Sequence, residues 1–96
     1  MAIQAVIIEP EDNVGVALMP LEVGTKLELK AGSKVVQIKL LEPIPYQHKF
    51  SVKDIANGKE ILKHGIVIGV ATKDIKQGEH VHVHNMTGLR AKAAKR

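Results

Sequence analysis

The sequence has no cysteine and no tryptophan, and apart from its five histidines its only aromatic residues are Tyr46 and Phe50. Without cysteine there is no disulfide framework, no thiolate nucleophile and no cysteine-ligated zinc or iron–sulfur cluster. Two aromatic rings are too few for the stacking platforms that bind single-stranded nucleic acid. No apolar run approaches the roughly 20 residues that a membrane-spanning helix needs. We therefore expect a protein that binds neither nucleic acid nor membrane.

The positive charge is confined to the C-terminal end. Four of the 14 Lys and Arg residues lie beyond Gly88, which leaves ten against the ten Asp and Glu residues of the preceding body. A basic tail on a neutral body is typical of a solvated terminus, not of a surface that follows phosphates. The excess comes from Arg90, Lys92, Lys95 and Arg96.

The length of 96 residues suits one small domain with a single modest core. We expect this domain to span residues 1–88 and the tail to span residues 89–96. The N-terminus lacks the basic, apolar and small-residue regions of a signal peptide, so we expect a soluble, cytoplasmic protein. A homo-oligomer is left open.

Short β-branched or alternating segments separated by turn residues predict a nearly all-β chain, with at most one helical turn over residues 51–55. The unbroken apolar run 66–71 predicts a strand buried on both faces, and Gly69 predicts a bulge or a close backbone approach. The predicted strands cover residues 2–8, 14–18, 25–29, 35–41, 60–63, 66–72 and 80–84.

A weak internal repeat supports this interpretation. Residues 54–61 match residues 74–81 at a spacing of 20, and residues 21–27 form a weaker third copy. Each copy predicts a tight turn with a positive φ at its glycine. We expect Asp54 and Asp74 to cap these turns, a structural role that we prefer to catalysis.

Three histidines alternate with two valines near the end of the body. Strand alternation places His80, His82 and His84 on one face and directs Val81 and Val83 to the core. Imidazoles bind metals and exchange protons near neutral pH. The alternative is a surface strand whose imidazoles pair with a neighbouring strand, and the residues leave both interpretations open.

Strand geometry limits any metal site here. Side chains two residues apart lie about 6.5–7 Å apart and those four apart about 13 Å, whereas metal–nitrogen bonds measure about 2.0–2.1 Å. Two neighbouring imidazoles can therefore share one ion, but His80 and His84 cannot. The predicted pair is His82 and His84, with Asn85 beside it as a hydrogen-bond donor or substrate clamp.

His48 and Lys49 form a second candidate site, in the irregular stretch between Pro45 and Phe50. His48 could act as a general acid or base and Lys49 could bind a carboxylate, although a solvated loop pair is the alternative. His64 is expected to be exposed and inert. The chain has no Ser-His-Asp order, glycine-rich phosphate loop or zinc-protease motif.

Four blocks of the chain, residues 45–50, 54–58, 65–72 and 78–85, resemble in order and spacing the small N-terminal module of the altronate and galactarate dehydratases. Residues 12–18 fit the beginning of that module, so the resemblance runs from about residue 9 to residue 86. It implies a SAF-type domain with a β-clip fold. In three places the chain departs from the family's usual pattern: Gln47 stands for glycine, His64 for tyrosine and Val70 for a basic residue.

The resemblance implies a hydro-lyase subunit that is inactive without a large dehydratase partner and removes water from a sugar acid to give a 2-keto-3-deoxy acid. It implies a divalent metal, iron(II) first and manganese or magnesium next, held mainly by the partner. The catalytic residues would be His48, His82 and His84, with Lys49 and Asn85 binding substrate and His82 and His84 ligating metal. The alternatives are a small subunit of sulfolactate sulfo-lyase and a non-catalytic module that binds a metal or an anion. The 12–18 block favours the sugar-acid branch.

Overall fold

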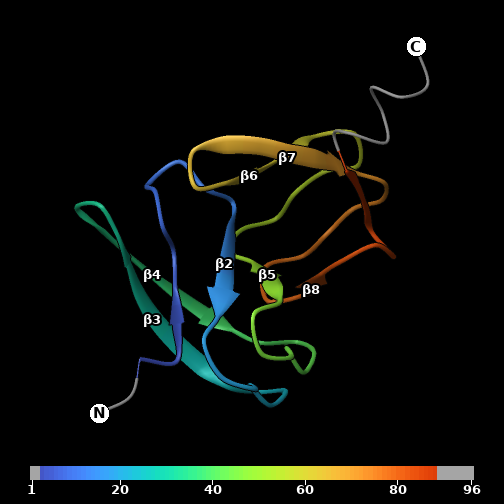
Figure 1. Ribbon diagram of the computed structural model, residues 1–96. Helices are drawn as coiled ribbons and strands as arrows, with labels where there is room; N and C mark the ends of the chain where they lie inside the picture. The colour runs from blue at the N-terminus through green and yellow to red at the C-terminus, as the bar shows by residue number, and fades with distance from the viewer. Residues whose placement is uncertain (1–2, 89–96) are drawn as a thin grey trace.

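The computed structural model describes residues 3–88 and contains nine strands and no helix within that range (Figure 1). The strands form three antiparallel sheets, which confirms the predicted all-β class. The described residues accordingly contain no helix that could cross a membrane. The predicted basic tail lies outside the described residues.

The first sheet has four short strands in the order β1-β2-β5-β8, the second is the β3–β4 hairpin, and the third has the order β6-β7-β9. Figure 1 shows the hairpin extending to the left of the first sheet, while β6 and β7 cross above it. The strands are β1 (Ala5–Val6), β2 (Val14–Ala17), β3 (Lys26–Ala31), β4 (Lys34–Lys39), β5 (Lys49–Ser51), β6 (Glu60–Lys63), β7 (Ile66–Ala71), β8 (His80–Val81) and β9 (Met86–Gly88).

Most predicted strands form within one or two residues of their expected bounds, but three expectations were wrong and the short strands β5 and β9 were not predicted. The first strand is only two residues long, the strand expected over residues 80–84 ends at Val81, and β7 is not buried on both faces, because Ile66 is 60% exposed. The expectation for Gly69 is confirmed. The register of β6 and β7 shifts beside it, and a Cβ at Gly69 would collide with the Thr87 carbonyl of β9.

Four copies of one tight turn, here called clip turns, organise the chain. Each makes a backbone hydrogen bond of 3.0–3.2 Å from its fourth residue to its first carbonyl, and each has a positive φ at its third residue. This is the pattern of a type II β-turn. The clip turns are residues 22–25, 45–48, 56–59 and 76–79, with the positive φ at Gly24, Gln47, Gly58 and Gly78.

Each clip turn is fastened to a distant strand or strand end by two more backbone hydrogen bonds. In clip turn 45–48 the Gln47 N–H donates to the Ala17 carbonyl at 2.8 Å, and the Ala17 N–H donates to the His48 carbonyl at 2.9 Å. The other three turns repeat this exchange with Leu40, Ala71 and Ser51. The turns are therefore held by backbone N–H and carbonyl groups, which do not depend on the type of side chain at these positions.

The clip turns are also joined in two pairs. The residue before each turn forms an isolated antiparallel bridge, Leu21 with Ile44 and Ile55 with Ile75. In the second pair each aspartate caps the turn of the other copy, since Asp54 accepts from the Gln77 N–H and Asp74 from the Asn57 N–H, both at 2.9 Å. The predicted capping role of Asp54 and Asp74 is confirmed.

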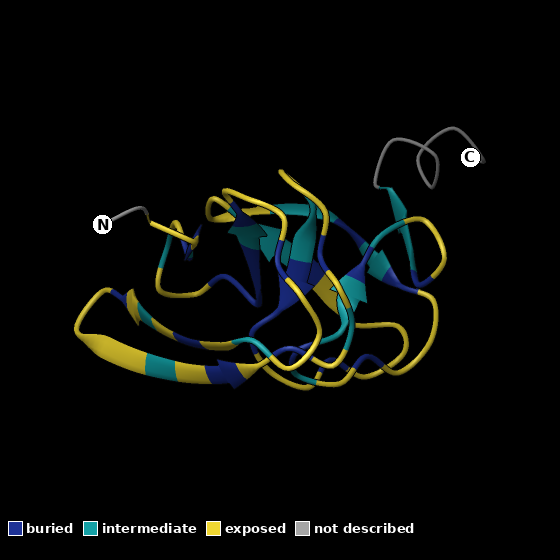
Figure 2. Cartoon of the chain, turned by 90° about the horizontal axis from the view of Figure 1, so that it is seen from below, coloured by how far each residue is buried: buried dark blue, intermediate teal, exposed yellow. Residues whose placement is uncertain are grey.

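The first sheet separates two apolar cores. Phe50, Ala17 and Leu40 belong to the core under the β3–β4 hairpin, whereas Val14 and Val81 belong to the core under β6, β7 and β9. Figure 2 shows the buried residues concentrated between the exposed hairpin and the opposite layer. Because strand side chains point alternately to opposite faces, β2 contributes to both cores, through Ala17 to the first and Val14 to the second.

Asp12 and Asn13 connect the first sheet to the third. The buried Asp12 carboxylate accepts hydrogen bonds from the N–H groups of His64 at 2.8 Å and Gly65 at 2.9 Å, at the tip of the β6–β7 hairpin. Both hairpin residues have positive φ, as in a type I′ turn. The Asn13 side chain pairs with the backbone of β6 through Leu62. His64 is exposed, as predicted.

Replacing Gln47 with glycine is predicted to raise the free energy of unfolding by about 0.5–1 kcal/mol. A left-handed conformation costs a non-glycine residue about 1–2 kcal/mol, which exceeds the roughly 0.4–1 kcal/mol that glycine adds in unfolded-state entropy. Urea denaturation measures the difference. The matched control is Gly58→Ala, where no atom lies within 4 Å of the added Cβ, and which should lower stability by about 1–2 kcal/mol. A destabilised Gln47→Gly variant would contradict the strain at this turn.

Candidate functional site

Four imidazoles meet on one face of the first sheet, and we call them the histidine cluster: His48, His80, His82 and His84. His48 is the last residue of clip turn 45–48, and His80 begins β8 directly after clip turn 76–79. Because the two turns are fastened to neighbouring strands, the two residues are brought side by side from positions 32 apart in the sequence. His82 and His84 follow on the loop between β8 and β9.

The rings of the cluster lie close enough to act on one another. The Nδ1 of His48 and the Nε2 of His80 are 2.8 Å apart, so one of them donates a hydrogen bond to the other. His82 stacks on His48 with ring centroids 4.7 Å apart and lies 5.4 Å from His80. His84 is 5.5 Å from His80. The arrangement can hold one shared proton and can present several imidazole nitrogens to a common ligand.

The predicted histidine strand is wrong beyond Val81. The strand ends there, residues 82–85 turn back, and Val83 is 81% exposed instead of facing the core. The turn also removes the basis for separating His80 from His84 by about 13 Å. His80, which was not part of the predicted pair, contacts all three other rings.

Asn85 holds this turn together. Its side chain is buried, its Oδ1 accepts a hydrogen bond from the His82 N–H at 2.9 Å, and its Nδ2 donates to the His80 carbonyl at 2.8 Å. Asn85 therefore fixes the direction in which the chain leaves β8. An asparagine that bonds to nearby backbone is a known turn signal, and the sequence carried it at this position. Substrate binding by Asn85 stays a prediction.

Lys49 lies on the other side of the sheet from the cluster. It pairs with Val81, which belongs to the second core, whereas the neighbouring Phe50 pairs with His80 and packs in the first core. Burial and the positive charge of Lys63 lower the pKa of Lys49. The structure thus brings His48, His82 and His84 together but does not bring Lys49 to them. Binding of a substrate carboxylate by Lys49 stays a prediction.

Glu42 is a contact of the cluster that the sequence did not reveal. Its Oε1 accepts the backbone N–H of His80 at 2.8 Å. The pKa of His80 is lowered from its ordinary value by burial and by the nearby His48, His82 and His84, and the Glu42 carboxylate opposes part of this effect. A contact across 38 residues, without a motif, leaves no local signal in the sequence.

The donor chemistry of the cluster fits a partial metal site. A lowered pKa keeps the His80 imidazole neutral, which is the form that ligates metal. Within residues 3–88, however, no three His, Asp or Glu side chains are arranged to hold an ion.

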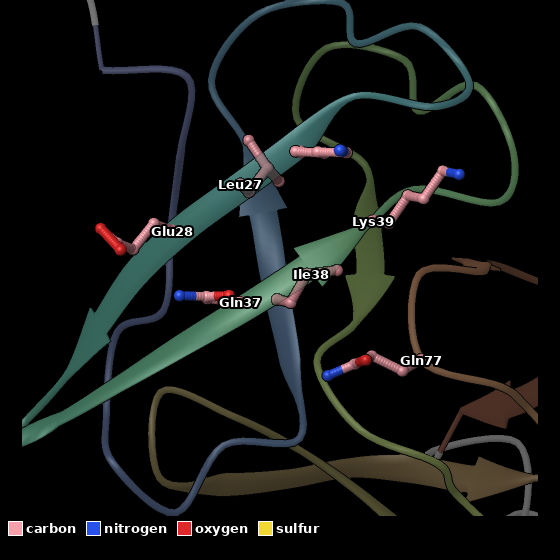
Figure 3. A pocket seen from close by; sticks show the side chains of 7 residues that line it. Leu27, Glu28, Gln37, Ile38, Lys39 and Gln77 are labelled. Atoms are coloured by element: carbon pink, nitrogen blue, oxygen red, sulfur yellow. The ribbon is translucent and has the colours of Figure 1, made fainter.

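A separate cavity of about 450 Å³ lies along the β3–β4 hairpin (Figure 3). Gln77 reaches it from the chain segment that leads to β8, and its Nε2 donates a hydrogen bond to the Val52 carbonyl at 2.8 Å. The side chains around it are polar or charged apart from two apolar strand residues, and no imidazole of the cluster is among them. Its lining is Lys26, Leu27, Glu28, Gln37, Ile38, Lys39 and Gln77.

These features define the class of the protein as an all-β clip domain that presents histidines on an open face. The sequence profile of the altronate/galactarate dehydratase SAF domain matches residues 3–89. The chain belongs to this family, which confirms the resemblance found in the sequence.

Relatives of this chain occur in two settings. It is 34% identical over 89 residues to (2R)-sulfolactate sulfo-lyase subunit alpha of Chromohalobacter salexigens, covering 90% of this chain and 95% of that protein. It is 40% identical over 82 residues to altronate dehydratase of Escherichia coli and 37% identical over 78 residues to that of Bacillus subtilis. Those matches cover 85% and 81% of this chain but only 16% and 15% of the dehydratases.

Replacing Asn85 with alanine is predicted to lower the free energy of unfolding by about 1–3 kcal/mol, because the His82 N–H and the His80 carbonyl lose their buried partner. Urea denaturation measures this loss. Asn57→Ala is the matched control, since Asn57 is exposed and uses only its backbone N–H. Equal stability of the two variants would contradict the assigned role of Asn85.

His80 is predicted to titrate below the ordinary histidine pKa of about 6.5. Since the unfolded chain then binds the proton more readily, the contribution of His80 to stability is full above pH of about 6.5 and is lost as the pH falls toward the folded pKa. NMR titration of the imidazole should show the pKa rising in His48→Gln and falling further in Glu42→Gln. Unchanged titration in both variants would refute the stated causes.

Proposed function

We propose that this chain is the small subunit of a sugar-acid dehydratase, a hydro-lyase similar to altronate dehydratase, and that it contributes histidines to an active site completed by a large subunit. The proposal includes the cytoplasmic location expected from the sequence and leaves self-association open. It rests on membership of the dehydratase SAF family together with the histidine cluster.

The single observation that carries the proposal is the convergence of four imidazoles from two separate segments. Dehydration of a sugar acid removes a proton beside a carboxylate and expels hydroxide from the adjacent carbon, so it needs a base and an acid close together. Ring centroids 4.7–5.5 Å apart place two proton-carrying groups within reach of neighbouring substrate atoms. In this scheme His48 and His82 exchange the protons, while His80 shares a proton with His48.

The open face of the cluster supports a shared site. His84 is exposed and the other three rings are only partly covered, so a substrate on this face would remain in contact with water. Exclusion of water strengthens the electrostatic interactions on which proton abstraction depends. A second polypeptide over the cluster would supply that wall, in keeping with the small share of altronate dehydratase to which this chain corresponds.

A divalent metal, iron(II) or alternatively manganese or magnesium, belongs to this proposal as a group held mainly by the large subunit. His82 and His84 would add ligands from this chain, and the metal would stabilise negative charge that develops on the substrate carboxylate. This chain's own task is to place imidazoles at the site, and the lowered pKa of His80 favours the neutral form of that ring.

The second candidate function is that of a sulfolactate sulfo-lyase small subunit. Its support is the match over 95% of the length of a relative that is itself a subunit alpha. A third candidate, a non-catalytic module that binds a metal or an anion, would use the same imidazoles without proton transfer. We prefer the dehydratase because the family profile is that of the altronate and galactarate enzymes.

The test is reconstitution with the purified large dehydratase subunit. The chain alone should show no turnover, and the mixture should convert an aldonate or aldarate to a 2-keto-3-deoxy acid. His48→Ala and His82→Ala should each lower kcat by roughly 10²–10⁴-fold, the range for loss of an acid–base group, and His84→Ala should lower kcat through loss of a metal ligand. His64→Ala is the matched control, because His64 is exposed at the β6–β7 turn and should leave kcat unchanged.

Two outcomes would redirect the proposal. Release of sulfite from sulfolactate, without turnover of any sugar acid, would identify the sulfo-lyase function instead. Weaker ligand binding in His82→Ala and His84→Ala, with kcat unchanged in the complex, would leave a binding module without catalysis.

A further inference from the structure

Three exposed apolar side chains lie on segments that also carry the histidine cluster or a residue bonded to it: Leu41, Tyr46 and Val83, here called the apolar rim. Their exposures are 47%, 55% and 81%. Isolated apolar residues on a surface need no explanation, but several around one functional group are typical of an interaction site. Whether the three residues form one surface depends on how each of their segments is attached to the cluster.

Val83 is held in its exposed position. It stands between His82 and His84 at the tip of the turn that Asn85 fastens through the His82 N–H and the His80 carbonyl. The turn therefore cannot easily rotate Val83 inward, and solvent exposure of an aliphatic group has no benefit for the isolated chain. A rigid turn that presents a valine outward is suited to contact with another surface.

The other two rim residues are connected to the cluster through hydrogen bonds of their own segments. Leu41 donates its N–H to the Gly78 carbonyl at 2.9 Å, and the next residue, Glu42, accepts the His80 N–H. Tyr46 lies in clip turn 45–48, whose last residue is His48. All three rim residues therefore lie within two sequence positions of a cluster histidine or of Glu42, which hydrogen-bonds to His80.

The relatives indicate what could cover this face. The chain corresponds to 16% of altronate dehydratase, so most of that enzyme is polypeptide that this chain does not contain. Covering the cluster with that polypeptide would bury the rim, since any wall close enough to enclose a small substrate also meets the residues beside the imidazoles. Tyrosine at the centre of an interface often carries much of the binding energy, and the fully buried core of an interface is more apolar than its edge.

We propose that the apolar rim is the surface on which the large dehydratase subunit docks, so that docking and closure of the active site are one event. This inference rests on the proposed function for the identity of the partner. It adds the site of contact and assigns to Leu41, Tyr46 and Val83 a role in binding the subunit and none in proton transfer.

The test measures the Kd between this chain and the purified large subunit by analytical ultracentrifugation, without substrate. Val83→Ser and Tyr46→Ser should each weaken binding at least 10-fold, and the double variant at least 100-fold. Ile66→Ser is the matched control, because Ile66 is 60% exposed but begins β7, in the third sheet, and it should change Kd less than 2-fold. Unchanged far-UV circular dichroism and thermal midpoints establish that the variants are folded.

Three outcomes would overturn the docking surface: rim variants that bind as well as Ile66→Ser, an Ile66→Ser variant that binds as poorly as they do, or rim variants that only dissociate a homodimer of this chain. Failure of the proposed function looks different. A complex that forms through the rim but dehydrates no sugar acid supports the docking surface and contradicts the dehydratase.

Discussion

The two backbone hydrogen bonds that fasten each clip turn to a distant strand are the constraint on which the site depends. Clip turn 45–48 is fastened to Ala17 and clip turn 76–79 to Ser51, and these turns deliver His48 and His80. Because β2, β5 and β8 are neighbours in one sheet, fastening both turns to that sheet brings the two imidazoles within 2.8 Å. Loss of either attachment would release one half of the cluster.

The cluster also depends on groups that are not histidines. Asn85 closes the turn that carries His82 and His84, and Glu42 accepts the N–H of His80 from the opposite side. The three other imidazoles all lie against His80, and their proximity is one cause of its lowered pKa, after burial. The cluster is thus a set of partly exposed imidazoles held at the surface by contacts from distant segments.

The first sheet separates two candidate site residues that are adjacent in the sequence, His48 and Lys49. His48 and Phe50 point to the face of the cluster and the first core, while Lys49 points with Val81 toward the second core. The Lys49 ammonium therefore lies on a different face from the imidazoles, near the positive charge of Lys63. Successive side chains of a strand point to opposite faces, so two residues that are adjacent in the sequence do not share one site.

The sequence by itself determined the all-β class, most strand positions, the turn capping by Asp54 and Asp74, and the family, because these depend on local residue patterns. It misplaced Val83 and underestimated His80, because a short alternating run does not show where a strand ends. It also concealed the clip turn at Gln47, where the usual glycine is absent. Only the tertiary structure decided which histidines meet and that Glu42 joins them. The histidines meet because backbone hydrogen bonds join distant segments, and such bonds produce no side-chain pattern in the sequence. The Glu42 contact spans 38 residues and has no local motif either.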